Sequence, residues 1–169
     1  MIHPSRSPQD VLALNLTIRM GDIRRGGYVL SESADGRAAQ VVLIGTGSET
    51  SLSVQAQKIL ASEGIAVRVV SMPSTSVLGW QAPIWQDAVL PHGCRAVAIE
   101  ATHPDFWRKY VGRQGAVVGL STYGESAPAK DLYAYFGITA QAGALAARQV
   151  MLSPVKAPDA LAAATGATA

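Results

Sequence analysis

The chain has 169 residues, a formal net charge of +2 and 15% charged residues. That length fits one domain of ordinary size, and a hydrophobic fraction of 49% can fill one buried core. The basic residues are scattered rather than clustered, so the charge pattern gives no case for a nucleic-acid partner. No apolar run approaches the roughly 20 residues of a membrane helix, and we expect no membrane partner.

The single cysteine, Cys94, excludes an internal disulfide. A chain without disulfides suits a reducing compartment, so the cytoplasm is the expected location. The first residues include Pro4 and Pro8 and lack the apolar segment of a secretory signal, which agrees with this expectation.

Three regions are expected along the chain. Residues 1–24 show no clean hydrophobic period, and we interpret them as a linker or arm. The folded domain is expected over residues 25–152. Residues 153–169 are rich in Ala, Thr and Pro, and we expect a flexible tail.

The first predicted strand covers residues 28–30. A turn signal, Asp35-Gly36, lies between this strand and the next apolar run at residues 41–44. These two runs are therefore candidates to pair as an antiparallel hairpin.

Residues 41–44 form a continuous apolar run in which three of four residues are β-branched, which is typical of a strand buried on both faces. Ser48 is the predicted cap of the following helix, and Gly64 is predicted to end that helix. The next strand is predicted at residues 66–70. A strand, a helix and a second strand with short connections indicate parallel strands and a right-handed crossover.

The second half of the chain continues the same alternation, with strands predicted at residues 95–99 and 116–120. Buried parallel strands need helices on both faces, so the expected fold is a three-layer α/β/α sandwich. In the helical parts, Trp80 and Trp85 are predicted packing residues. Gly137 is predicted to end the helix that follows Pro128, and Thr139 is the predicted cap of the last helix.

The glycine-containing turn after the first buried strand departs from the dinucleotide-binding fingerprint. The third glycine of that fingerprint is replaced by Thr50, and the next strand ends in Val70-Ser71 without an acid for a ribose. We therefore do not expect a dinucleotide. The turn remains a possible site for a small anion because it precedes a helix, although Glu49 beside it weakens that attraction. The residues of this candidate turn are Gly45, Thr46, Gly47 and Ser48.

Two further groups of polar residues stay open. His103 lies near Glu100 and Asp105, and we interpret this segment as the entry to a helix rather than as a catalytic cluster. Glu125 and Ser126 follow the last predicted strand, where α/β sheets often place functional groups, or they act as a capping pair for the next helix. No metal-ligand spacing and no catalytic residue is identified.

Five collinear segments together resemble the last domain of transketolase. They are Arg-Gly-Gly-Tyr-Val-Leu at 25–30, Ile-Gly-Thr-Gly-Ser-Glu at 44–49, Arg-Val-Val-Ser-Met-Pro-Ser at 68–74, Trp-Arg-Lys-Tyr-Val-Gly at 107–112 and Tyr-Gly-Glu-Ser-Ala-Pro at 123–128. The resemblance covers about residues 24–150. It implies a five-stranded mixed sheet in which the first strand is antiparallel to the other four.

The resemblance also implies the context of a complete transketolase. That enzyme is a homodimer that transfers two-carbon ketol units between sugar phosphates, with thiamine diphosphate and Mg²⁺ as cofactors. The family holds both cofactors in its first two domains, so this chain alone is expected to bind no cofactor and to be inactive. Its expected partners are the missing thiamine-binding domains, a second copy, or both.

One functional residue of the family falls near a matching position. Transketolases have a Ser-Arg-Gln segment about 20 residues before the Gly-Gly-Tyr-Val-Leu stretch, and its arginine binds the substrate phosphate. Ser5-Arg6-Ser7 lies near that distance but departs from the pattern at Ser7. Arg6 is therefore a candidate substrate-phosphate ligand.

Two function hypotheses follow. In the first, the chain is the structural, dimer-supporting carboxyl-terminal domain of a transketolase-type enzyme. In the second, it is a stand-alone, non-catalytic domain for small-anion binding or oligomerisation.

Overall fold

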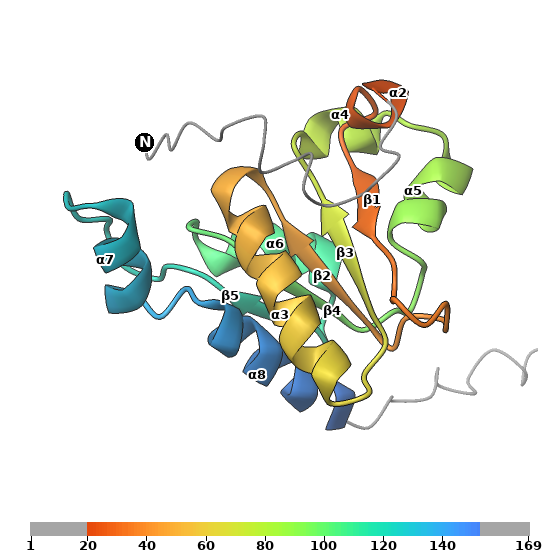
Figure 1. Cartoon of the computed structure of the whole chain (residues 1–169). Coiled ribbons are helices and arrows are strands. Elements are labelled where there is room, and N and C mark those ends of the chain that lie inside the picture. Colours follow the sequence, from red (N-terminus) through yellow and green to blue (C-terminus); the bar gives the residue numbers. More distant parts are fainter. Residues whose placement is uncertain (1–19, 153–169) are drawn as a thin grey trace, which may run out of the picture.

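Five short strands form one sheet in the order β1-β3-β2-β4-β5 (Figure 1). The structure is a computed structural model, and it describes residues 20–152. All five predicted strands are present, and their ends lie within two residues of the predicted ends. The strands are β1 Tyr28–Ser31, β2 Val41–Gly45, β3 Val67–Ser71, β4 Ala96–Ile99 and β5 Ala116–Val118.

Four strands are parallel and β1 is antiparallel to its neighbour, as the family resemblance implied. The predicted hairpin between β1 and β2 is wrong, because β1 pairs with β3. The reason is that β3 and β4 occupy the two edges of β2, so β2 has no free edge for β1.

Helices cover both faces of the sheet and complete the predicted three layers. In Figure 1, α3 and α8 lie in front of the sheet, α6 lies behind it, and α7 stands off at the left. The helical elements are α2 Met20–Ile23, the 3₁₀ turn η1 Gly47–Glu49, α3 Thr50–Ser62, α4 Thr75–Gly79, α5 Pro83–Val89, α6 Pro104–Val111, α7 Ala129–Tyr135 and α8 Ala140–Leu152. No helix within residues 20–152 is both long and apolar enough to span a bilayer.

The core has two halves, one on each face of the sheet. On the first face, side chains of α3 and α8 pack against β2, β3 and β4, with Leu43 and Ile99 fully buried. On the second face, residues of α4, α5 and α6 cover Ile44 and Val70. Burying β2 completely on both sides stabilises the centre of the domain, since apolar burial is the main favourable term in folding.

Several of the predicted helix ends are confirmed. Gly64 and Gly137 follow α3 and α7 with positive φ angles of 76° and 69°, which suits glycine at a helix end. The N–H of Ala142 donates to Thr139 Oγ1 at 3.1 Å, so Thr139 caps α8 as predicted.

The predicted cap Ser48 is wrong. The 3₁₀ turn delays the start of α3 to Thr50, and the residue at the cap position, Glu49, forms no side-chain cap bond. The Ser48 hydroxyl instead contacts Glu49 and Tyr133.

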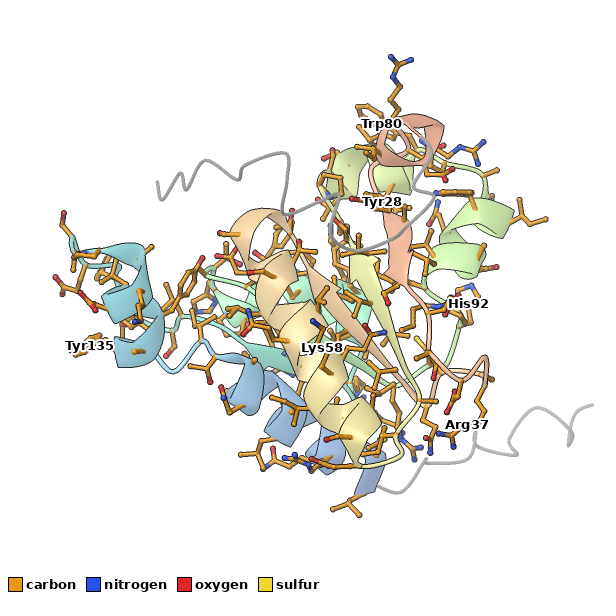
Figure 2. All side chains as sticks on the ribbon, in the orientation of Figure 1. Tyr28, Arg37, Lys58, Trp80, His92 and Tyr135 are labelled. Carbon is orange, nitrogen blue, oxygen red and sulfur yellow. The ribbon has the colours of Figure 1, made fainter. Side chains whose placement is uncertain are left out.

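The predicted packing role is confirmed for only one of the two tryptophans. Trp85 packs against the second half of the core, and its Nε1–H donates to the Gly27 carbonyl. Trp80 is 80% exposed and lies at the outer end of the molecule near α4 (Figure 2). Trp80 comes directly after the end of α4, and the buried residue of that helix is Leu78. Leu78 therefore takes the position that packs against the core.

Candidate functional site

A cavity of about 1160 Å³ lies at the carboxyl ends of the parallel strands. Its walls come from the turn after β2, the segment after β4, the loop after β5 and α7. The chain leaves β2 toward β3 on one side and reaches β4 on the other side, so the strand order reverses between β2 and β4. Open α/β sheets bind their ligands at this kind of position.

Glu100 lies at the inner end of the cavity, immediately after β4. Glu100 is only 2% exposed, and its Oε1 accepts a hydrogen bond from the backbone N–H of Thr46 at 2.5 Å. Burial and the nearby Glu49 carboxylate raise the pKa of Glu100 to about 8, although the Thr46 hydrogen bond acts in the opposite direction. A carboxyl group with this pKa is protonated in a large fraction of molecules at neutral pH.

Glu49 is the second buried carboxylate and is 7% exposed. The Tyr133 hydroxyl donates to its Oε1 at 2.7 Å, and the Ser48 hydroxyl donates to its Oε2 at 2.9 Å. Burial is the largest cause that raises the pKa of Tyr133 to about 12, and the carboxylates of Glu49 and Glu100 add to it. Tyr133 therefore remains a neutral donor, which suits its contact with Glu49.

The candidate anion-binding turn borders this cavity. Gly45 permits the turn because a Cβ atom there would lie 2.7 Å from Ser53 Oγ. One backbone donor of the turn, the Thr46 N–H, is already bonded to Glu100. Anion binding at Gly45, Thr46, Gly47 and Ser48 stays a prediction, and a buried acidic pair beside the turn opposes it.

The other predicted polar residues have mixed outcomes. The His103 side chain accepts from the Asp105 N–H at 3.4 Å at the start of α6, which confirms the helix-entry interpretation. Glu125 and Ser126 line the cavity. Their capping interpretation is wrong, because Pro128 holds the cap position of α7 and no side chain caps that helix. Arg6 lies outside the described residues.

Sequence reasoning missed the group formed by Glu49, Glu100 and Tyr133. Tyr133 and Glu49 are 84 positions apart, and α7 alone brings the tyrosine to the cavity. The available signal was that both glutamates closely follow buried strands, whose carboxyl ends meet at one edge of the sheet. No local pattern indicated the tyrosine.

The described residues offer no metal site. Within residues 20–152, no group of three or more His, Cys, Asp or Glu side chains could hold a metal ion. The site thus combines a proton-carrying acid, an ionisable neighbour and a neutral phenol, which is chemistry suited to binding a hydrogen-bonding ligand.

The fold and the position of the cavity define an open α/β domain with a ligand-type crevice at its strand-order reversal. The family described as a transketolase-like TK C-terminal domain matches residues 26–139. The chain therefore belongs to the transketolase family, in which it corresponds to the C-terminal domain.

Relatives and solved structures agree with this assignment. The chain is 44% identical to transketolase 2 of Pasteurella multocida over 79% of its length, and 50% identical to transketolase 2 of Escherichia coli over 71%. It spans only 20% and 18% of the lengths of these two relatives. Transketolase from Leishmania mexicana superposes with a TM-score of 0.70 at 37% identity, covering 81% of this chain and 20% of that one.

A more distant structure shares the fold alone. It is titled "Split gene transketolase, inactive beta4 tetramer", and it has a TM-score of 0.54 at 24% identity. The match covers 76% of this chain and 43% of that chain.

Proposed function

We propose that this chain serves as the C-terminal domain of a transketolase-type enzyme that transfers two-carbon ketol units between sugar phosphates. The observation that carries the proposal is a family match over residues 26–139, in a chain that spans about one fifth of its relatives. The domain supports assembly and is not catalytic alone. The alternative, a stand-alone anion-binding or oligomerisation domain, is not favoured.

The cofactors of the complete enzyme do not fit the described residues. Thiamine diphosphate carries a negatively charged diphosphate, and a divalent metal needs several oxygen or nitrogen ligands. The cavity has three glutamates and no Lys or Arg among its described lining residues, and no metal-ligand group exists in residues 20–152. Thiamine diphosphate and Mg²⁺ would therefore be held by the parts of the enzyme that are not in this chain.

The partners of the domain follow from the same proposal. The missing thiamine-binding domains are the expected partners, together with a second copy in a homodimer in the cytoplasm. One matched structure is described as a split-gene transketolase. This supports the expectation that the partner domains can lie on a separate chain. Residues 25–152 would be the folded domain, with residues 1–24 as the linker that offers Arg6 to a substrate phosphate and 153–169 as the tail.

A complementation experiment tests the proposal. Transketolase 2 of E. coli would be shortened by the segment that matches this chain, and the two purified proteins would be mixed. We expect a complex and thiamine-dependent consumption of xylulose phosphate that neither protein shows alone. If no complex and no activity appear at high concentrations of both proteins, the proposal fails, provided that the matching E. coli segment restores activity in the same assay.

A further inference from the structure

The cavity lining is acidic. Glu49, Glu100 and Glu125 all line it, and the lining contributed by residues 20–152 includes no Lys or Arg. The lining also includes His103, whose side chain is 61% exposed. A cavity of this composition repels phosphates and attracts cations, because the low dielectric of a partly enclosed site strengthens charge interactions.

One oxygen of Glu100 has no hydrogen-bond partner among residues 20–152. Its Oε1 is bonded to the Thr46 N–H, whereas no described group donates to Oε2. The structure leaves only one fully enclosed side-chain polar atom without a partner in residues 20–152, and that atom is Thr50 Oγ1. Glu100 Oε2 therefore opens onto the cavity, although the residue as a whole is 2% exposed. A buried polar group of this kind is costly unless a ligand or water bonds it.

Aromatic rings line the same space. Tyr133 and Phe136 reach it from α7, and Tyr123 reaches it from the loop after β5. Carboxylates combined with aromatic rings are the groups that recognise alkylammonium ions, through charged hydrogen bonds and the negative faces of the rings. The cavity, at about 1160 Å³, is also larger than a single side chain would fill and slightly exceeds the roughly 300–1,000 Å³ of typical small-molecule sites.

We propose that this cavity binds a small organic cation, a primary alkylammonium compound, whose N–H groups donate to Glu100 Oε2. Glu49 adds negative charge, and its own oxygens stay bonded to Tyr133 and Ser48. The site is separate from the ketol-transfer function proposed above, and neither proposal depends on the other.

Binding should depend on pH in a defined direction. Glu49 and Tyr133 on α7 interact electrostatically with Glu100, and the other titratable residues of the cavity lining are His103, Tyr123 and Glu125. The pKa of Glu100 is raised to about 8, so below that pH an ammonium ion must displace its proton. Affinity should therefore increase by up to about tenfold per pH unit between about pH 6 and pH 8.

The test titrates the full chain with three ligands of one shape, n-butylammonium, n-butanol and butyl phosphate, and follows binding by NMR. At about pH 9, where Glu100 is ionised, we expect only n-butylammonium to bind, with shifted signals from Thr46 and Tyr133. Equal binding of n-butanol or butyl phosphate would overturn the inference. So would the absence of ammonium binding at concentrations up to about 10 mM, which corresponds to a negligible affinity.

A matched pair of variants locates the binding. Glu100→Gln keeps the shape of the side chain and an acceptor for Thr46, and we expect it to weaken n-butylammonium binding at least about tenfold. Glu63→Gln removes an exposed carboxylate at the other end of α3, about 20 Å away for a helix of 13 residues, and should leave affinity unchanged. Equal affinities of the two variants would overturn the assignment. The three-ligand comparison needs no variant and decides the case if Glu100→Gln fails to fold.

Discussion

Glu100 and Glu49 lie 51 positions apart in the sequence and become neighbours because each follows a strand near the centre of the sheet. Burying these carboxyl groups affects the stability of the fold. A carboxyl group with a raised pKa prefers its neutral form, so the folded protein holds a proton that the unfolded chain would release. Stability should then depend on pH through this one side chain.

Glu100→Gln should reveal that dependence. The pKa of Glu100 rises from 4.5 to about 8 on folding, so its contribution to stability is full below about pH 4.5 and is lost as the pH rises through 8. We expect the variant and the parent to unfold alike near pH 5. At about pH 9 the variant should be more stable, by at most about 5 kcal/mol at about 1.4 kcal/mol per pKa unit.

Urea unfolding at several pH values measures this difference. Comparing the two proteins at each pH cancels the effects of other carboxyl groups, such as Asp35 and Glu63, whose pKa values are lowered by exposed partners. A stability gap that does not change with pH would show that Glu100 does not titrate as described.

A second prediction concerns the close packing around Gly45. A Cβ atom at this position would crowd Ser53 Oγ and the backbone of Thr50, so Gly45→Ala should destabilise the domain by about 1–3 kcal/mol. The control is Gly79→Ala, in α4, where a Cβ atom meets nothing within 4 Å and the change should be neutral or slightly stabilising. Thermal unfolding of both variants checks the pair, and equal effects would contradict the steric argument.

The elements pack through small residues on one face of the sheet. Ala56 of α3 and Ala144 and Ala147 of α8 are fully buried, and Gly143 of α8 lies close to Ala56 and Ile99. Small side chains allow the two helices to approach each other and the sheet closely. This contact fixes α8 against α3 and so completes the layer that covers β2 and β4.

Enlarging one of these residues should therefore be costly. Ala144→Leu adds three carbons to a site without free space, and we expect a loss of about 1–3 kcal/mol or more. Ala134→Leu makes the same change at an exposed position of α7 and should alter stability by less than about 0.5 kcal/mol. Denaturant unfolding of both variants measures the difference. Comparable losses would indicate that the α3–α8 contact is looser than described.

The strands were predictable because their signal is local. Apolar runs rich in β-branched residues identified β2 and β3, and glycine positions identified the ends of α3 and α7. The pairing of β1 was not predictable from its neighbours in sequence, because it depends on which edges of β2 are already occupied. The cavity was predictable only in its location, since α7 supplies Tyr133 from a distant part of the chain.

At the scale of the whole molecule, the described residues form one α/β domain that spans about one fifth of the length of its relatives. We expect thiamine diphosphate with Mg²⁺ to leave the thermal midpoint of the isolated chain unchanged, because its described residues suit neither group. A ligand bound at about 100 times its Kd would add about 2.7 kcal/mol of stability and raise the midpoint by several degrees. A complete transketolase relative serves as the positive control.

The place of β1 at the edge of the sheet has a consequence for where the chain could be divided. The five strands of the sheet lie between Tyr28 and Val118, and β1 is the first of them and borders only β3. Within residues 20–152, a break just before Tyr28 would cut none of the hydrogen-bonded strand pairs and would expose no interior strand. The sheet itself therefore does not require covalent continuity at that point.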